Sequence, residues 1–301
     1  MDKFPSRERS AALAAGARVS AIVVAHRANA ALDLCLRSAL AEPWIDELIV
    51  VDHANAADVS STLRALMADR RDVKIVSTKT ADGAPKLTSG ALANMGAAHA
   101  HGRWLLFLDP DVVLKRGAAQ RLAVAGGDAR APWVVGGRLT GTDGRERRAA
   151  RMGKLNTWSA LAVATAMPGP KSRKVKNGAR PGATKAAAVS GAFMLVQRSD
   201  FEDLGGFDTG YATDGADLDL CRRAAEAGGS VLYHPSASGV QFLRDRNGRR
   251  QAQGLALFAA RSAKTPFERA FAAIARPAFE VLLALRAFVA GRPPVRRRRA
   301  R

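Results

Sequence analysis

A chain of 301 residues is long enough for one large domain or two small ones. Its hydrophobic fraction of 48% is enough for a sizeable core and excludes global disorder. The 47 Lys and Arg residues exceed the 27 Asp and Glu residues by 20, which indicates an anionic partner: nucleic acid, an acidic membrane face or a phosphate-bearing substrate.

The N-terminal residues 1–17 form a polar, Ala-rich arm without the apolar stretch of a signal peptide. No run of about 20 uncharged apolar residues is present, so no transmembrane helix is expected. Cys35 and Cys221 lie far apart and lack the spacing of a disulfide framework or a metal site, which favours a reducing cytosol. The expected location is therefore cytoplasmic.

The first hundred residues alternate between continuous apolar runs and segments of helical periodicity. Strands are expected at 19–25, 47–52, 73–76 and 104–108, with helices at 31–40, 58–69 and 87–100 between them. The strands at 19–25, 47–52 and 104–108 are expected to be buried. Such alternation is typical of an open, mostly parallel α/β sheet flanked by helices, in which ligands bind at the carboxyl ends of the strands. Asp52 and Asp109 both stand at such ends.

The second half of the chain is less regular. Residues 145–185 carry eleven basic residues and one acidic residue, which indicates a mobile basic loop. Regular structure is expected again at 187–197, in a helix and glycine turn at 199–206, in a helix at 217–227 and in a strand at 230–234. An amphipathic helix is expected over 266–290, before a basic run. The predicted parts are an arm at 1–17, a domain at 18–245 and a helical, basic tail at 246–301.

The segment LLFLDPD, residues 105–111, places Asp109 and Asp111 at one turn after a buried strand, with the backbone dihedral fixed by Pro110. Two carboxylates together with nucleotide phosphates suit Mg²⁺ or Mn²⁺, hard cations that prefer oxygen. Such a cation neutralises charge that develops on a leaving diphosphate. Alone, so short a motif is more typical of a capped turn at Asp109 with a solvated Asp111.

The longer string GALANMGAAHAHGRWLLFLDPDVVL resembles the donor-binding core of glycosyltransferase family 2, inverting enzymes of the GT-A fold that include rhamnosyltransferases. Further similar segments follow the family's chain order: VSAIVVAHRANAALDLCLRSAL, ELIVVDHAN, VSGAFMLVQRSDFEDLGGFD and GADLDLCRRAAEAGG. The resemblance covers about residues 18–242 and implies a GT-A type open sheet with helices around it.

The resemblance also implies roles for individual residues. Asp217 matches the catalytic base, although a helix N-terminal cap is the alternative. The implied donor-binding residues are Ala25, Asp52, Asn94 and Asp109, with His26 as a further candidate just past the first strand. The implied metal ligands are Asp109, Asp111 and, weakly, Gln241. The implied acceptor region contains Gly191, Gly206 and Asp208. The expected donor is a UDP-, dTDP- or GDP-sugar, and the expected acceptor is a saccharide or lipid-linked saccharide of the cell envelope or an exopolysaccharide.

Three positions depart from the family pattern. Ala216 replaces the Glu beside the base, Gln241 replaces a late His, and His53 replaces an Asn or Asp. These departures leave open a relative that binds nucleotide without turnover. A nucleic-acid-binding protein would explain the charge, but aromatic residues are only 6% and no reading motif is present, so no specific nucleic acid is expected. A dinucleotide-dependent oxidoreductase would need a G-x-G-x-x-G after the first strand, which is lacking.

The two basic segments have two interpretations each. The loop at 145–185 is expected either to close over the donor, with Lys and Arg on the diphosphate, or to be a solvated linker. The tail is expected either to lie on an anionic membrane surface, peripheral to the inner face of the cell membrane, or to pack on the catalytic domain.

Overall fold

The computed structural model describes residues 18–26, 31–68, 70–78, 87–147, 151–152, 182–212, 214–242 and short stretches between 254 and 270. The chain forms two compact units, residues 1–155 with 171–244 and residues 156–170 with 245–301. The predicted arm and most of the predicted basic loop and tail lie outside the described residues. Within the described part, no helix has the length and apolar character needed to cross a bilayer.

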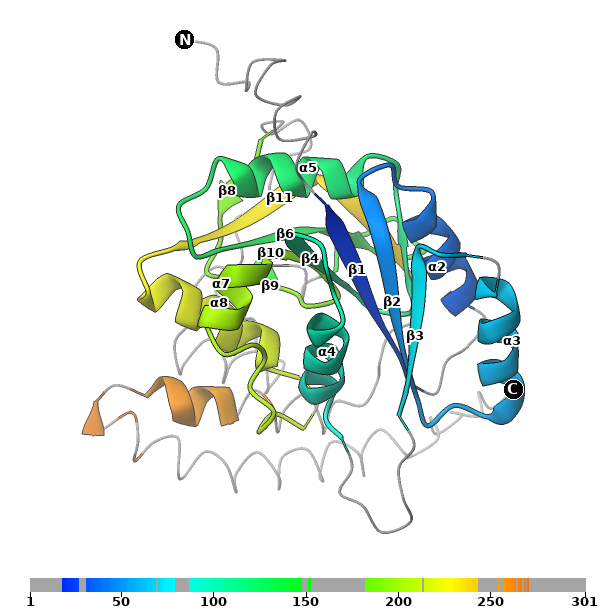
Figure 1. Cartoon of the computed structure of the whole chain (residues 1–301). Helices are drawn as coiled ribbons and strands as arrows, with labels where there is room; N and C mark the ends of the chain where they lie inside the picture. The colour runs from blue at the N-terminus through cyan, green and yellow to red at the C-terminus, as the bar shows by residue number, and fades with distance from the viewer. Residues whose placement is uncertain are drawn as a thin grey trace, which may run out of the picture. The chain divides into compact units, whose positions relative to one another are not determined.

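The N-terminal half of the sheet is parallel, with the order β3-β2-β1-β4 (Figure 1). The strands β1, β2 and β4 are mostly buried, and α4 lies against β1 and β2, whereas no residue of β3, at the edge of the sheet, is fully buried. The four strands and three helices predicted here are confirmed to within a few residues. They are β1 (Val19–His26), α2 (Ala31–Leu40), β2 (Ile45–His53), α3 (Ala57–Met67), β3 (Val73–Thr78), α4 (Ser89–Ala98) and β4 (Trp104–Leu108).

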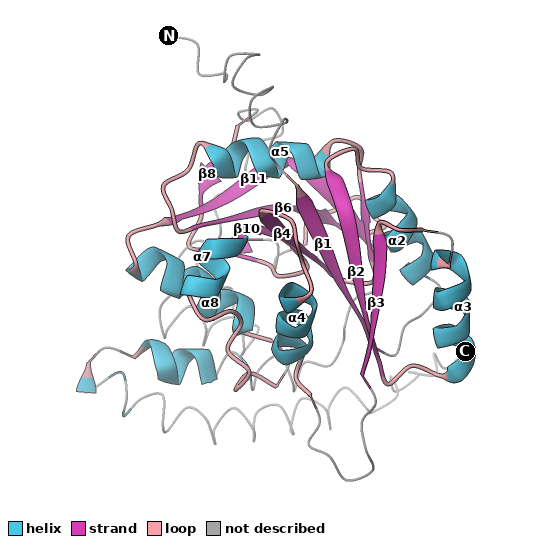
Figure 2. Cartoon of the chain, in the orientation of Figure 1, coloured by secondary structure: helices cyan, strands magenta, loops and turns pink. Residues whose placement is uncertain are grey.

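The sheet continues through strands of both directions, with the full order β3-β2-β1-β4-β10-β6-β11-β5 (Figure 2). The strand β10 runs antiparallel between β4 and β6, whereas β11 runs parallel to β6 and antiparallel to β5. The expected α/β sheet flanked by helices is confirmed, with the parallel pairing concentrated in its first half. The elements of this part are β5 (Val112–Leu114), α5 (Ala118–Gly127), β6 (Trp133–Thr140), β10 (Phe193–Gln197) and β11 (Ser230–Gln241).

The remaining elements bring the later segments onto this sheet. The helices α7 (Arg198–Asp203) and α8 (Ala216–Glu226) agree with the predicted helices at 199–206 and 217–227. Both ends of the predicted loop at 145–185 are paired rather than free, which corrects its expected boundaries. The strand β7 (Arg151–Met152) pairs with β9 (Ala188–Val189), and β8 (Thr184–Lys185) pairs with β11.

In the second unit, a capping box begins a helix where the sequence predicts one. The backbone N–H of Thr265 donates to the Glu268 carboxylate at 3.1 Å, and the N–H of Glu268 donates to the Thr265 hydroxyl at 3.1 Å. This reciprocal pair satisfies two backbone donors at the helix start, and Pro266 suits the first helical position. The predicted continuation to residue 290 lies outside the described residues.

Candidate active site

Three of the predicted donor-site residues lie at one edge of the parallel sheet. The strand β1 pairs with both β2 and β4, with Ala25 opposite Asp52 and Val23 opposite Leu108, the residue before Asp109. The carboxyl ends of parallel strands meet at the same edge, so Ala25, Asp52 and Asp109 are neighbours in space. Asp52 is buried there, with 6% of its surface exposed.

Asn55 fixes the ends of β1 and β2 to each other, and the sequence analysis did not select it. Its side-chain amide donates to Asp52 Oδ1 at 2.7 Å and to the Ala25 carbonyl at 2.7 Å. Ala54 adopts a left-handed φ of 51°, which turns the chain sharply after β2 and returns Asn55 toward the sheet. The Asp52 carboxylate therefore has a defined orientation. A polar side chain three residues after a strand-terminal Asp is the sequence signal for this contact.

The two histidines at this edge form a stacked pair. The rings of His26 and His53 are 5.2 Å apart at an interplanar angle of 26°, and His53 Nδ1 lies 2.6 Å from the Thr78 hydroxyl. Burial lowers the pKa of His53 and the neighbouring His26 lowers it further, while Asp52 opposes the shift. His53 is therefore a neutral, buried part of the wall beside Asp52 at neutral pH.

Asp109 follows β4 and lies in a group of carboxylates. Its backbone N–H donates to the Ala192 carbonyl at 3.0 Å. Its side chain reaches solvent on one side, yet burial by the surrounding protein, followed by the charges of Asp111, Asp217 and Asp214, raises its pKa to about 7. The predicted metal motif and the predicted base are therefore close enough to interact electrostatically. Asp214 is an additional member of the group that the sequence analysis missed, although it stands three residues before the predicted base.

Asp217 lies in the first turn of α8, which begins after Gly215 in a left-handed conformation with φ 106°. Its carboxylate accepts from the backbone N–H of Gly191 at 2.9 Å and from that of Leu218 at 2.9 Å. Burial nevertheless outweighs these hydrogen bonds and raises the pKa of Asp217. A Cβ at Gly191 would lie 3.1 Å from the Cβ of Asp217, so the predicted acceptor-region glycine contacts the predicted base directly.

Two of the predicted side chains have hydrogen bonds within the protein. Gln241 Nε2 donates to Asp111 Oδ1 at 3.3 Å, so Gln241 orients Asp111, and its amide oxygen as a cation ligand stays a prediction. The amide of Asn94 bonds the backbone of Phe207 in both directions, at 2.8 and 2.9 Å, so it holds a loop, and its role toward a nucleotide also stays a prediction. An amide binds a backbone or carboxylate partner as readily as a ligand.

The other predicted acceptor residues lie on the loop that Asn94 holds. Gly206 has φ 69°, and a Cβ there would lie 2.9 Å from the amide oxygen of Asn94, so a side chain is excluded for two reasons. Asp208 accepts from the backbone N–H of Gly210 at 2.7 Å, which tightens the next turn. Phe207 packs on Phe107 of β4 with ring centroids 4.7 Å apart, and this contact brings the loop to the carboxylate edge.

A buried ion cluster joins this loop to α8. Asp219 is 3% exposed at its side chain and accepts from Arg222 and Arg223, three and four residues further along α8, at 2.7 Å each. Arg223 also donates to the carbonyls of Leu204 and Gly206. The helix that carries Asp217 and the loop that carries Asp208 are thereby linked.

Replacing Asp219→Asn should lower the free energy of unfolding by about 3 kcal/mol, because it leaves two partly buried guanidinium groups without their carboxylate. Urea denaturation measures the change. Glu226→Gln is the matched control, since it removes the exposed partner of Arg222 on the same helix and should cost less than about 0.5 kcal/mol. Equal losses in the two variants would contradict the assigned role of the cluster.

The described residues contain no cluster of three or more His, Cys, Asp and Glu side chains in the arrangement of a metal site. The donor chemistry around Asp109 nevertheless fits a hard divalent cation. Asp109 and Asp111 offer only oxygen, and burial followed by repulsion from the neighbouring carboxylates raises the pKa of Asp109. A cation at this position would relieve that repulsion.

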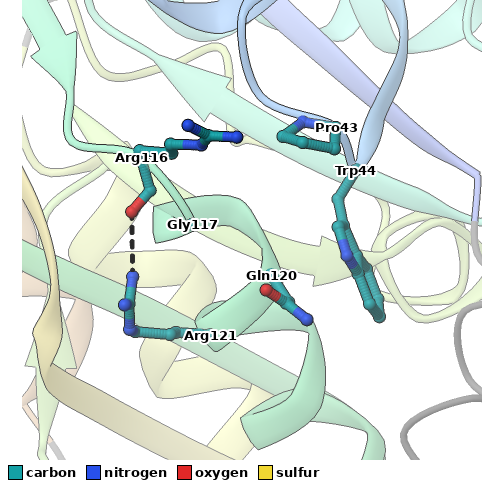
Figure 3. Close-up of a pocket in the computed structure, with 6 residues that line it drawn as sticks. All are labelled: Pro43, Trp44, Arg116, Gly117, Gln120 and Arg121. Atoms are coloured by element: carbon teal, nitrogen blue, oxygen red, sulfur yellow. Dashed lines mark hydrogen bonds between the residues drawn. The ribbon is translucent and has the colours of Figure 1, made fainter.

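A shallow depression of about 430 Å³ lies elsewhere on the molecule. Figure 3 shows Pro43 and Trp44 facing Arg116, Gln120 and Arg121, with Arg121 donating to the Arg116 carbonyl at 3.1 Å. Trp44 immediately precedes the nine-residue strand β2, whereas Asp52 stands near its other end, about 25 Å away at 3.3 Å per residue. The depression is therefore separate from the carboxylate group.

Residues 17–276, most of the chain, match the family described as "Glycosyltransferase like family 2". The chain belongs to this family. The rhamnosyltransferase WbbL of Escherichia coli (strain K12) is 40% identical to this chain over 58 residues, which are 19% of this chain and 22% of that relative. This chain therefore aligns with less than a quarter of the curated relative's length.

Solved structures of glycosyltransferases show the same fold. GalNAc-T7, solved with UDP, GalNAc and Mn²⁺, has a TM-score of 0.59 at 14% identity, over 76% of this chain and 44% of its own. The mannosyltransferase PcManGT of Pyrobaculum calidifontis, solved with GDP-Man and Mn²⁺, has a TM-score of 0.57 at 19% identity, over 93% and 77%. Residues 1–349 of S. aureus TarS, solved with UDP-GlcNAc, have a TM-score of 0.53 at 12% identity, over 85% and 69%. The predicted GT-A fold of this family 2 member is confirmed.

Proposed function

We propose that this family 2 member transfers a sugar from a nucleotide diphosphate donor to an acceptor hydroxyl, with inversion at the anomeric carbon. The observation that supports it most directly is the short turn before β10, residues 190–192. Its Ala192 carbonyl binds the backbone of Asp109, and its Gly191 N–H binds the carboxylate of Asp217. The same turn therefore binds both the backbone of a donor-side residue and the carboxylate of the candidate base.

On the donor side, Ala25 and the oriented Asp52 carboxylate would hold the nucleoside, with the carboxylate accepting from the base or ribose. Asp109 and Asp111 would hold Mg²⁺ or Mn²⁺ with the diphosphate, and Gln241 would keep Asp111 in place. A cation bound there supplies positive charge to the leaving diphosphate. The complexes of PcManGT with GDP-Man and Mn²⁺ and of TarS with UDP-GlcNAc support a nucleotide-sugar donor.

On the acceptor side, the Asp217 carboxylate takes the proton of the acceptor hydroxyl. The acceptor oxygen forms its bond to the anomeric carbon as the bond to the diphosphate oxygen breaks on the opposite face. This single displacement needs one base, so Ala216 in place of a second carboxylate is compatible with turnover. Burial raises the pKa of Asp217, and a raised pKa makes a carboxylate a stronger base.

The acceptor we propose is a saccharide or lipid-linked saccharide of cell-envelope or exopolysaccharide synthesis, and the transferred sugar a hexose or deoxyhexose. The similarity to rhamnosyltransferase WbbL over 58 residues supports this assignment. The formal charge of +20 supports an anionic membrane surface as a further partner.

The test is a panel of UDP-, GDP- and dTDP-sugars with Mn²⁺, read first by thermal stabilisation. A ligand at 100 times its Kd stabilises the folded state by about 2.7 kcal/mol, which raises the melting temperature by several degrees. The stabilising donor is then incubated with free and lipid-linked saccharides, and release of nucleoside diphosphate is measured. Stabilisation without release would favour the alternative that this protein binds nucleotide without turnover. Ala216 in place of the family's Glu is the observation behind that alternative. No stabilisation by any donor would overturn the proposal.

The raised pKa of Asp109 predicts how pH affects this cation site. The carboxyl has an ordinary pKa of 3.8 when unfolded and about 7 when folded, so its contribution to the stability of the cation-free protein is fully present below the unfolded pKa and is lost as the pH rises through about 7. Mn²⁺ competes with the proton. The rise in melting temperature caused by Mn²⁺ should therefore be small at about pH 5.5 and large at about pH 8, as scanning fluorimetry would show. Asp109→Asn should remove this pH dependence, and a persistent dependence in that variant would contradict the assignment.

A further inference from the structure

Arg147 is held at the end of the sheet that faces the predicted metal motif. Residues 140–147 form a tight turn after β6, closed by the hydrogen bonds of Gly141 N–H to the Arg145 carbonyl at 2.9 Å and of Arg147 N–H to the Leu139 carbonyl at 2.8 Å. The Arg147 guanidinium then reaches the end of β11, where Nη2 donates to the Gln241 carbonyl at 3.2 Å.

Gln241 connects this guanidinium to Asp111. Its backbone accepts from Arg147, and its side chain donates to Asp111 Oδ1 at 3.3 Å. The next backbone N–H, that of Phe242, donates to the Asp111 carbonyl at 2.9 Å. Arg147 is therefore one residue removed from the carboxylate that we assign to the cation.

The guanidinium has no acidic partner within 4.0 Å among the residues that the structure describes, although acidic residues are near in sequence. Glu146 accepts from the Tyr233 hydroxyl at 2.9 Å and lies 3.7 Å from Arg138. Asp143 Oδ1 accepts from the backbone of Arg145 at 3.1 Å. The Nε of Arg147 is itself buried without a hydrogen-bond partner. No described carboxylate therefore neutralises this guanidinium at ion-pair distance, and an anion beside its outer nitrogens would do so.

Local packing holds the guanidinium in this position. A Cβ at Gly141 would lie 2.6 Å from Asp143 Oδ1 and 3.0 Å from both Cζ and Nη2 of Arg147, so both side chains rest against the bare backbone of Gly141. A larger residue at 141 would displace it. The side chain is thus oriented in advance, which reduces the entropy that ligand binding must overcome.

We propose that Arg147 binds the diphosphate of the donor and stabilises the charge that develops on it as the leaving group departs. This assignment rests on the proposed function. The forked guanidinium matches two phosphate oxygens, and its place beside Gln241 puts it on the flank of the cation site formed by Asp109 and Asp111. Among the basic residues of 145–185 that the structure describes, Arg147 is the one whose side chain contacts Gln241, the partner of Asp111.

The experiment titrates the Mn²⁺ complexes of UDP, GDP and dTDP into the full chain by calorimetry, and continues with whichever nucleotide binds the wild type. Arg147→Ala should weaken binding of that diphosphate by about 10- to 100-fold, the range expected for loss of a charged hydrogen-bonded contact. Arg147→Lys should recover part of the loss because it keeps the charge but not the fork. Arg145→Ala is the matched control, since it removes the same charge from an exposed side chain of the same turn.

The corresponding nucleoside serves as the second ligand, because Asp52 rather than Arg147 would bind it. Weaker diphosphate binding in Arg147→Ala with unchanged nucleoside binding and an unchanged Arg145→Ala variant is the result expected. Wild-type affinity in Arg147→Ala would overturn the assignment alone and leave the proposed function standing. Equal loss for both ligands would show that Arg147 only supports β11, which also overturns it. No binding of any of the three nucleotides by the wild type would overturn the proposed function and this assignment together.

Discussion

Asp217→Asn is expected to slow sugar transfer by about 100- to 10,000-fold, the usual contribution of a general base, while nucleotide affinity stays within about twofold of the wild type. The amide cannot accept the acceptor's proton, but it occupies the same space. It still accepts one of the two backbone hydrogen bonds, from Gly191 or Leu218, that the carboxylate accepts. Steady-state rates with the donor found by stabilisation, together with calorimetry for the nucleoside diphosphate, measure both quantities.

Glu226→Gln is the control for this variant, because it neutralises an exposed carboxylate at the other end of the same helix, α8. Its transfer rate should equal that of the wild type. Loss of nucleotide affinity in Asp217→Asn comparable to its loss of rate would mean that Asp217 holds the donor rather than acting as the base. A fully active Asp217→Asn variant would exclude Asp217 as the general base and make Asp214 the next candidate for that role.

Asp111→Ala should remove the dependence of nucleotide binding on Mn²⁺ and weaken binding of the Mn²⁺–nucleotide complex by about 100-fold. Loss of groups that merely orient a metal ligand costs about 10- to 100-fold, and loss of the ligand itself should cost at least as much. Asp111 is 8% exposed and fixed by Gln241, so no other described carboxylate takes its place without rearrangement. Calorimetry with Mn²⁺ and with chelator separates the two contributions.

The matched control is Asp203→Ala, an exposed carboxylate at the end of α7. It should leave binding unchanged both with Mn²⁺ and with chelator. If Asp111→Ala retained a full Mn²⁺ effect, the cation would have to be held by other groups, and the proposed role of the Asp109–Asp111 turn would be wrong.

The predicted elements agree best where each strand buries its own apolar run. The strands β1 and β4 could be predicted without knowing which strands pair with them. Every residue of β4 is buried, and the turn after it carries the carboxylates. β6 gives a weaker signal because it contains Gly136 and Gly137. A Cβ at these positions would lie 2.3 Å from Val189 and 2.0 Å from Phe193, so both glycines reflect tertiary contacts that the sequence does not reveal.

The same limit applies to the candidate site. Asp52, Asp109 and Asp111 follow strands, and the edge that collects them could be predicted from alternation alone. The orientation of amides could not, because the partners of Asn94 and Gln241 come from segments more than 100 residues away in sequence. The role of Arg147 could not be predicted from the sequence for a related reason. Its neighbours in sequence are also basic, and the contact with Gln241 is what distinguishes it.

Residues 190–192 impose a constraint on how enzymes of this design can change their acceptor. Main-chain atoms of this turn, rather than its side chains, bind Asp109 and Asp217 and so set the spacing between the two halves of the proposed catalytic centre. Point substitutions in the acceptor loops can therefore alter which hydroxyl is presented without shifting the line of attack on the donor. Insertions or deletions next to that tripeptide would shift the line of attack on the donor. Variation in length should therefore be tolerated elsewhere in the chain and selected against beside residues 190–192.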